Sequence, residues 1–223
     1  MPKTAVLIGA TGATGAALLP LLLEADAYDC VQTFTRRPIS LSHPKLEAHV
    51  VDFSEMAHWS DLSEVDDVFL VMGTTLKQAG SRAAQYEVDF TFQAEFAKLA
   101  RVCGAKRCFI VSSPGADPNS RNFYLRIKGE LDEYVRQLGY HTIVFKPSLI
   151  KARRSQPRMA EQLGCLILPS VCRLPGLSQY RPIEAEILAR AIAVIATQES
   201  HPRAEYALSV IHDIAASADT RES

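Results

Sequence analysis

The sequence predicts an α/β protein in which helices cover both faces of a parallel sheet. Two observations predict this class: apolar, β-rich runs alternate with segments of helical spacing, and a glycine-rich turn follows the first such run. The 223 residues, of which 48% are hydrophobic, are enough for one sizeable core. We therefore expect a single doubly wound, Rossmann-type domain over residues 1–223, without internal repeats.

The first half of the chain alternates strand-like and helical runs, as a doubly wound sheet requires. In order, we expect a strand at Thr4–Gly9, a helix at Ala13–Ala25, strands at Cys30–Thr35, His49–Val51 and Asp67–Met72, and a long helix at Arg82–Cys103. The fourth strand is almost continuously apolar, as a strand buried on both faces should be. Tyr86, Phe90, Ala94 and Ala97 give the long helix its apolar spacing.

The second half continues this alternation around a segment of different composition. We expect a strand at Arg107–Val111, a helix at Phe123–Leu138, a strand at His141–Phe145, a helix at Glu184–Thr197 and a strand at Tyr206–Val210. From Lys146 to Arg181 the chain has seven basic residues and one acidic residue, with several prolines and glycines. We expect residues 148–182 to form an irregular basic lobe, and the tail from Ala215 to be frayed helix or disordered.

Three glycines stand at regular spacing where the first strand should turn into the first helix. Glycine is needed where such a turn is strained and where a phosphate approaches backbone amides, and a helix N-terminus favours a pyrophosphate. Glycines that serve only close packing of helix and strand are the alternative. The candidate dinucleotide-binding turn comprises Gly9, Thr11, Gly12, Ala13, Thr14 and Gly15.

The same N-terminal run has a second interpretation as a signal peptide, because few charges follow Lys3 and Ala25-Asp-Ala27 resembles a cleavage site. Regular glycines and Pro20 fit an export helix poorly. Thr11 and Thr14 interrupt the apolar stretch that a membrane span requires. We therefore expect neither an export signal nor a membrane span.

Composition limits the classes of partner and compartment. The formal net charge of −1 gives no reason to expect nucleic acid or an anionic membrane. The five cysteines are odd in number and without CxxC spacing, which favours reduced thiols and a cytoplasmic location. The six histidines lack HxxxH and HExxH spacing, so no metal site is expected.

The residues after the second strand bear on the type of dinucleotide. Arg36 and Arg37 stand where an NAD site usually has a carboxylate facing the ribose 2′-hydroxyl. Paired arginines can bind a 2′-phosphate instead, which favours NADP(H), although they could also be solvated loop charges. Asp52, just past the third strand, could accept a hydrogen bond from adenine or cap the next turn.

Small residues follow the fourth strand. Gly73, Thr74 and Thr75 form a corner that should lie beside the glycine turn. Because ligands of open α/β sheets bind beyond the carboxyl ends of the strands, we expect Gly73 and Thr74 to leave room for a ribose or nicotinamide. A helix N-cap explains the threonines equally well.

A candidate catalytic set follows the fifth strand. Ser112-Ser113 ends this strand, and Tyr124 and Lys128 lie four residues apart in the next expected helix, so that their side chains share one face. A lysine ammonium near a phenol favours the phenolate form, which is useful for proton transfer. Tyr124 and Lys128 alone would suggest an ordinary helix pair, but together with Ser113 and a dinucleotide turn they indicate a catalytic site.

In combination these motifs resemble the short-chain dehydrogenase/reductase superfamily, and specifically its atypical, extended-like members. The group to which the chain is most similar is the Tat-interacting-protein oxidoreductases and their bacterial NAD(P)H-binding relatives. Over about residues 3 to 210, the resemblance is carried by the glycine turn, Arg36-Arg37, Gly73-Thr74-Thr75, Ser112-Ser113-Pro-Gly-Ala-Asp117, Tyr124, Lys128-Gly-Glu-Leu131 and Lys146-Pro-Ser148. The chain departs from the family in that Lys146-Pro-Ser148 replaces the usual Arg-Pro-Gly, and in a short interval between serine and tyrosine.

The resemblance implies NADPH bound at the carboxyl edge of a Rossmann sheet, with Ser113, Tyr124 and Lys128 as catalytic residues. It also implies that Lys128 contacts the nicotinamide ribose and that Arg158 in the basic lobe contacts the cofactor, with Arg153 or Arg154 as alternatives. The expected activity is NADPH-dependent oxidoreduction of a carbonyl or alcohol, whose substrate the basic lobe suggests to be anionic.

Two rival functions use the same features. One is an NADPH-binding sensor with little or no turnover and a protein partner. The other is an NADP-linked sugar epimerase, which the short C-terminal part disfavours. We expect a monomer or a homodimer, and the apolar turn Cys165-Leu-Ile-Leu168 could serve the core or a dimer surface.

Overall fold

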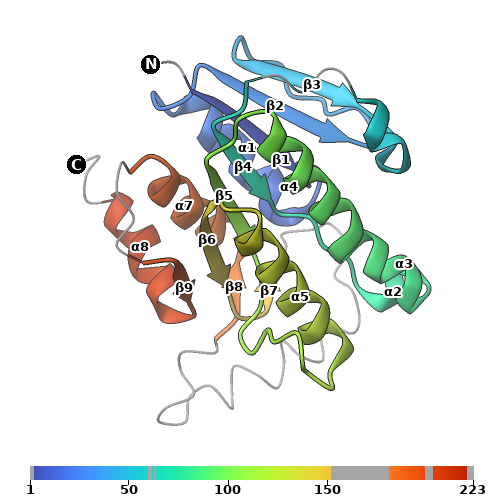
Figure 1. Cartoon of the computed structure of the whole chain (residues 1–223). Helices are drawn as coiled ribbons and strands as arrows, with labels where there is room; N and C mark the ends of the chain where they lie inside the picture. Colours follow the sequence, from blue (N-terminus) through green and yellow to red (C-terminus); the bar gives the residue numbers. More distant parts are fainter. Residues whose placement is uncertain (1–2, 60–61, 63, 152–180, 199–202, 220–223) are drawn as a thin grey trace.

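The computed structural model describes residues 3–59, 62, 64–151, 181–198 and 203–219. Its seven-stranded sheet has the order β3-β2-β1-β4-β5-β6-β9, and every neighbouring pair is parallel (Figure 1). The strands are β1 (Thr4–Ile8), β2 (Cys30–Thr35), β3 (Leu46–Val50), β4 (Asp67–Leu70), β5 (Arg107–Val111), β6 (His141–Lys146) and β9 (Glu205–Ala207). The chain winds outward from β1 to β3, returns to the centre and winds outward again from β4. This topology confirms the predicted doubly wound, Rossmann-type fold.

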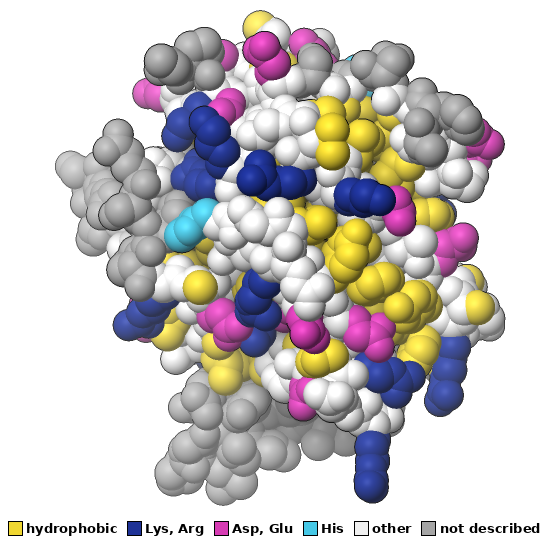
Figure 2. Space-filling model, viewed as in Figure 1, with side chains coloured by type: hydrophobic (Ala, Val, Ile, Leu, Met, Phe, Trp, Pro, Cys, Tyr) yellow, Lys and Arg dark blue, Asp and Glu magenta, His cyan; other side chains and the backbone are white. Residues whose placement is uncertain are grey.

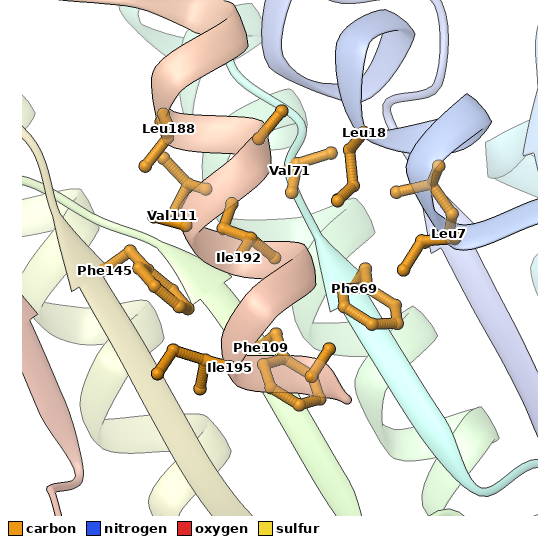
Figure 3. Close-up of a cluster of buried hydrophobic side chains, with 14 of the residues drawn as sticks. Leu7, Leu18, Phe69, Val71, Phe109, Val111, Phe145, Leu188, Ile192 and Ile195 are labelled. Atoms are coloured by element: carbon orange, nitrogen blue, oxygen red, sulfur yellow. The ribbon is translucent and has the colours of Figure 1, made fainter. Parts of the chain in front are cut away.

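Helices cover both faces of the sheet. On one face lie α1 (Ala13–Glu24), α7 (Ala185–Ala196) and α8 (Ser209–Asp219), and on the other lie α4 (Phe92–Val102), α5 (Phe123–Gln137) and the short 3-10 helix η1 (Phe53–His58). Residues of each strand alternate between the two cores, so that Leu7 faces α1 and α7 while Val6 and Ile8 face α4. Figure 3 shows the first core, in which Leu7, Phe69, Val71, Phe109, Val111 and Phe145 meet Leu18, Leu188, Ile192 and Ile195.

The prediction of a single long helix at Arg82–Cys103 is wrong in one respect, because a widened turn divides the helix. After the short α2 (Leu76–Ala79), α3 (Arg82–Tyr86) runs into the π-helical turn η2 (Glu87–Thr91), which leads into α4. The fully buried Gln93 donates from Nε2 to the carbonyl oxygens of Val88, at 3.4 Å, and Asp89, at 2.9 Å. A side chain thus satisfies backbone groups inside the widened turn.

The last predicted strand also needs correction. It ends at Ala207 rather than Val210, because Leu208 has a positive φ of 52° and α8 begins at Ser209. Ile211 and Ala215, four residues apart, are buried in the same core as α7, which is helical rather than strand spacing. The tail from Ala215 is helical as far as Asp219. At the other edge, β3 begins at Leu46, earlier than the predicted His49.

A second, two-stranded sheet stands at the ends of the predicted basic lobe. Strands β7 (Ile150–Lys151) and β8 (Ile183–Glu184) pair in parallel, with Ile150 opposite Ile183. Ser148 Oγ also donates a hydrogen bond to the carbonyl oxygen of Arg181. Residues 152–180, including Arg153, Arg154, Arg158 and the turn Cys165–Leu168, lie outside the described residues, so most of the lobe stays a prediction.

A buried polar network joins the amino ends of β4 and β5. Asp67 accepts hydrogen bonds from Tyr28 Oη and Arg107 Nε, each at 2.6 Å. Arg107 also donates to the carbonyl oxygens of Ala196, at 3.0 Å, and Gln198, at 3.1 Å, at the end of α7. The network fastens α7 to the sheet edge opposite the carboxyl ends of the strands.

Within the described ranges, no helix has both the length and the apolar character needed to cross a membrane. Figure 2 shows basic and acidic side chains interspersed across the face formed by α4 and α5.

Candidate active and cofactor site

All described candidate residues of the cofactor site lie at one edge of the sheet. Because the strands are parallel, the loops that follow them emerge together at the carboxyl edge. They carry Gly9 to Gly15 after β1, Arg36 and Arg37 after β2, Asp52 after β3, Gly73 and Thr74 after β4, and Ser113 after β5. The adjacent strands β1 and β4 lead to opposite halves of the sheet, which is the switch point where such folds bind ligands.

The glycine turn is required by its packing. Gly9 has a φ of +91°, and a Cβ there would lie 2.8 Å from the backbone nitrogen of Met72. A Cβ at Gly15 would lie 2.2 Å from the carbonyl oxygen of Gly9, which also accepts a hydrogen bond of 2.8 Å from Gly12 N. The glycines therefore do serve the close packing of helix and strand that we gave as the alternative, and this packing brings the start of α1 against the end of β1.

The N-terminus of α1 has the character of an anion site. Gly12 is its extended N-cap residue, no described side chain caps the helix, and the first turn has no acidic residue. The amides of the first turn thus receive no capping hydrogen bond from the described side chains, and they lie at the positive end of the helix dipole. Thr14 is buried and Thr11 is exposed beside this turn. The arrangement fits a phosphate group.

Arg36 and Arg37 are both exposed and follow β2 directly. Thr35 Oγ1 donates to the carbonyl oxygen of Arg37 at 2.8 Å, which fixes the start of their loop. Asp52 caps η1, because its carboxylate accepts from Ser54 Oγ at 2.7 Å and from Ser54 N at 2.9 Å. Both bonds, the side-chain bond foremost, lower the pKa of Asp52. Asp52 thus caps the turn that follows it, as one of the two alternatives expected, and its contact with adenine stays a prediction.

The corner after β4 is organised by a residue that sequence reasoning missed. Thr74 N donates to Asp89 Oδ1 at 3.1 Å, and a Cβ at Gly73 would lie 3.4 Å from the same oxygen. Thr75 caps α2 through its hydroxyl, which accepts from Gln78 N at 3.3 Å. The N-cap alternative therefore holds for Thr75, while Thr74 belongs to the contacts of Asp89.

Asp89 lies in η2 and is completely buried. Its Oδ1 is 3.9 Å from Lys128 Nζ, and its Oδ2 has no partner among the described residues. Burial raises the pKa of Asp89, opposed chiefly by the nearby charge of Lys128. The sequence held one signal: Gln85, Asp89 and Gln93 recur four residues apart, a polar stripe that normally indicates a solvent-facing surface.

The tyrosine and lysine lie on α5 as predicted but in different surroundings. Asn122 caps α5 by accepting from Tyr124 N at 3.0 Å and Leu125 N at 3.2 Å, which places the 39% exposed Tyr124 in the first turn. Lys128 is buried, and its Nζ donates to the carbonyl oxygen of Val111 at 3.3 Å. The phenol is thus accessible, while the ammonium is held between the end of β5 and η2.

The two serines after β5 differ in their surroundings. Ser112 Oγ donates to Asp132 Oδ2 at 2.7 Å within the core. Ser113 is half-buried, and among the described residues its Oγ makes only a long contact of 3.4 Å with the carbonyl oxygen of Pro114. Of the two serines, Ser113 is therefore the better placed to bind a ligand through its hydroxyl. No cluster of three or more metal-ligating side chains occurs among the residues with described positions.

The fold and this edge define a Rossmann-type α/β protein with the fold of short-chain dehydrogenases/reductases. The 3-oxoacyl-[acyl-carrier protein] reductase from Brucella melitensis, solved in complex with NAD, superposes with a TM-score of 0.70 at 13% identity over 97% of this chain and 98% of that one. A short-chain dehydrogenase from Streptomyces avermitilis gives a TM-score of 0.60 at 18% identity over 100% and 94% of the two chains. No family model matches the sequence.

The chain belongs to the Fmp52 family. It is 36% identical over 166 residues to "Protein fmp52, mitochondrial" of Emericella nidulans, covering 71% of both proteins. It is 33% identical over 194 residues to the protein of the same name from Aspergillus clavatus, covering 83% of both. Neither these names nor the solved structures mention a Tat-interacting protein, so that narrower resemblance stays a prediction.

The relatives correct the expected location. Their names call them mitochondrial, which contradicts the cytoplasmic location expected from the cysteines. The inference of a cytoplasmic location was wrong because unpaired cysteines argue only against oxidising, secretory compartments. They do not distinguish between the compartments inside the cell.

Proposed function

We propose that this protein is an NADPH-dependent oxidoreductase that interconverts a carbonyl and an alcohol, as an atypical member of the short-chain dehydrogenases/reductases. One observation carries the proposal: an uncapped helix N-terminus, two exposed arginines and the Tyr124–Lys128 pair lie at the same edge of one parallel sheet. The fold shared with a reductase that was solved in complex with NAD supports it.

The first part of the site would hold the cofactor. The amides at the start of α1, next to Gly12, would bind the pyrophosphate. Arg36 and Arg37 would bind the 2′-phosphate that distinguishes NADPH from NADH. Gly73 and Thr74 would face the ribose or nicotinamide, and the bound nicotinamide would supply the hydride. Arg158 in the basic lobe would add a further contact.

The second part would manage the oxygen of the substrate. Tyr124 would transfer a proton between its phenolic oxygen and the substrate oxygen, and Ser113 would hold that oxygen by a hydrogen bond. An ammonium group has three donors, of which one is directed to Val111 and one lies toward Asp89, so that Lys128 retains a donor for a cofactor ribose. Its positive charge would stabilise the phenolate formed when Tyr124 gives up its proton.

The cofactor preference is tested by titrating the protein with NADPH, NADP⁺, NADH and NAD⁺ and recording thermal shifts. We expect the phosphorylated pair to bind more tightly. Replacing Arg36 and Arg37 by alanine should weaken NADPH binding about tenfold or more, since charged hydrogen bonds contribute about 1.5–3 kcal/mol each, and should leave NADH binding unchanged. Lys98→Ala, which removes an exposed cation on α4, is the control. Equal shifts with both cofactor types would contradict the preference.

Catalysis is tested by NADPH oxidation against a panel of aldehydes, ketones and quinones. Tyr124→Phe should lower turnover by about 100-fold or more and change NADPH affinity less than twofold, because only proton transfer is lost. Unchanged turnover in this variant would exclude the assigned role. If the natural protein binds NADPH and reduces none of the panel, the sensor function is favoured instead.

We also propose a mitochondrial location, on the basis of the names of the relatives. A fluorescent fusion of the full-length protein, compared with a matrix marker, tests this. A diffuse signal throughout the cell would contradict it.

A further inference from the structure

Helix α5 holds the end of β5 at two consecutive residues. Lys128 Nζ donates to the carbonyl oxygen of Val111 at 3.3 Å, and the hydroxyl of Ser112 donates to Asp132 Oδ2 at 2.7 Å. Lys128 and Asp132 are four residues apart, and Tyr124 lies four residues before Lys128. One face of α5 therefore carries the candidate catalytic Tyr124, the candidate Lys128 and Asp132, which is the second residue of this helix to bind the end of the strand.

Asp132 is an unfavourable residue to bury. Only 2% of it is exposed, and its Oδ1 lies buried without a partner among the described residues. Burial raises the pKa of Asp132, while the Ser112 hydrogen bond and the charge of Lys146 oppose this effect most strongly. An apolar side chain would fill the same space without this desolvation penalty. The role of Asp132 must therefore lie in what its hydrogen bond to Ser112 holds in place.

That bond fixes the point at which the chain leaves the sheet. The backbone nitrogen of Ser112 donates to the carbonyl oxygen of Phe145 at 2.8 Å, so β6 holds its main chain while Asp132 holds its side chain. Ser113 is the next residue. Anchoring Ser112 on both sides sets the direction in which Ser113 departs from the strand.

The chain returns to α5 only a few residues later. Asp117 N donates to the carbonyl oxygen of Leu125 at 3.2 Å. A Cβ at Gly129 would lie 2.3 Å from the carbonyl carbon of Asp117, so that the loop lies directly against the helix there. The span that contains Ser113 is thus tied at both ends to the helix that carries Tyr124.

We infer that Asp132 is a positioning residue, which holds the end of β5 through Ser112 and so sets the place of Ser113 relative to Tyr124. The inference rests on the proposed function for the roles of Ser113 and Tyr124. Its structural half, the anchoring of the strand end, stands on the contacts alone.

Amide hydrogen exchange of the full-length protein tests the anchoring without any turnover. In Asp132→Leu, which cannot accept a hydrogen bond, peptides spanning residues 112–117 should exchange at least tenfold faster than in the natural protein. In Asp132→Asn, whose amide oxygen can still accept from Ser112, exchange should stay within about threefold. Glu133→Leu removes an exposed carboxylate from the next position of α5 and is the matched control. Unchanged exchange in Asp132→Leu would overturn the inference.

Kinetics test the consequence for the site, with the carbonyl compound of the panel that is reduced fastest. We expect Asp132→Leu to lower kcat at least tenfold at temperatures where the variant is folded and to change the KM for NADPH less than twofold, while Asp132→Asn restores most of kcat. Because Asp132→Leu also leaves the buried Ser112 hydroxyl without its acceptor, its melting temperature should fall, and kcat is compared well below that temperature. A merely structural role would leave kcat unchanged in the folded variant. Full kcat in Asp132→Leu overturns the inference. Absence of turnover in the natural protein counts against the proposed function, and the exchange comparison then decides for or against Asp132.

Discussion

The ammonium nitrogen of Lys128 lies 3.9 Å from Oδ1 of Asp89, and both side chains are almost completely buried. The pair joins α5 to the widened turn η2, directly beneath the corner formed by Gly73 and Thr74. The lysine that we propose to contact a cofactor is thus held by a carboxylate that also accepts a hydrogen bond from the backbone of Thr74.

Removing either member of this pair should be costly, and removing both should cost less than the sum of the two single losses. Asp89→Leu leaves a buried ammonium without its counter-charge, and we expect the free energy of unfolding to fall by about 3 kcal/mol. Lys128→Met should have a similar effect. The double variant should lose less than the sum of the two, which urea unfolding of the four proteins measures as a double-mutant cycle. Additive losses would show that the two side chains do not interact.

Two glycines with similarly positive φ values should differ in their tolerance of alanine. Gly9 and Gly80 have φ values of +91° and +82°, but a Cβ at Gly9 meets the backbone of Val71 and Met72 at 2.8 Å, whereas a Cβ at Gly80 meets nothing within 4 Å. Gly80→Ala should lower the free energy of unfolding by about 1–2 kcal/mol, the strain of a left-handed residue. Gly9→Ala should lower it by a further 1–3 kcal/mol or so, because the turn must also move. Thermal unfolding compares the two, and equal losses would contradict the steric argument.

The amino edge of the sheet should depend strongly on one carboxylate. Asp67→Ala leaves Arg107 and Tyr28 without their shared acceptor in the core, and we expect a loss of about 3–5 kcal/mol in the free energy of unfolding. Glu205 is the control, because it pairs with Arg136 and Lys146 at the surface with 44% of its side chain exposed. Glu205→Ala should cost less than about 1 kcal/mol. Similar losses in the two variants would show that burial does not set the strength of these pairs.

Asp132 should make stability depend on pH. Burial raises its pKa in the folded protein above the ordinary aspartate value of about 3.9, so the folded state binds this proton more tightly than the unfolded state. The resulting stabilisation is complete at low pH and is lost as pH rises through the raised pKa. Asp132→Asn cannot ionise, and its free energy of unfolding relative to the natural protein should increase from pH 4 to pH 7. A difference that is constant with pH would contradict the raised pKa.

The sequence predicted the architecture well, since apolar runs and their breakers are local signals. The bounds of β2 and β5 are those predicted, because charged or turn-forming residues flank both. The widened turn η2 and the left-handed Leu208 were not predictable. The widened turn is supported by hydrogen bonds from Gln93, a side chain only four residues beyond Asp89, and no spacing of apolar residues announces such bonds. Leu208 directly precedes α8, which packs on α7, and this tertiary contact cannot be read from local sequence.

The places of the candidate residues in the fold were predictable where a motif marks them. Gly9, Arg36, Ser113 and Tyr124 stand at the strand ends and helix starts where sequence patterns placed them, and the buried Lys128 was found through its spacing from Tyr124. The supporting carboxylates, Asp89 and Asp132, lie on helix faces that read as solvated because they are polar. Only the pairing of each carboxylate with a residue distant in the sequence accounts for its burial.

The parallel pairing of β7 with β8 has a consequence for engineering. Because Ile150 lies opposite Ile183, the residues that flank segment 152–180 on either side are neighbours in the structure. Exchanging this segment for that of a relative would preserve the order and the connections of all seven strands of the main sheet. Arg158, which we propose to contact the cofactor, and any residues of this segment that choose the substrate could then be exchanged between relatives without altering the strands that carry the other candidate residues.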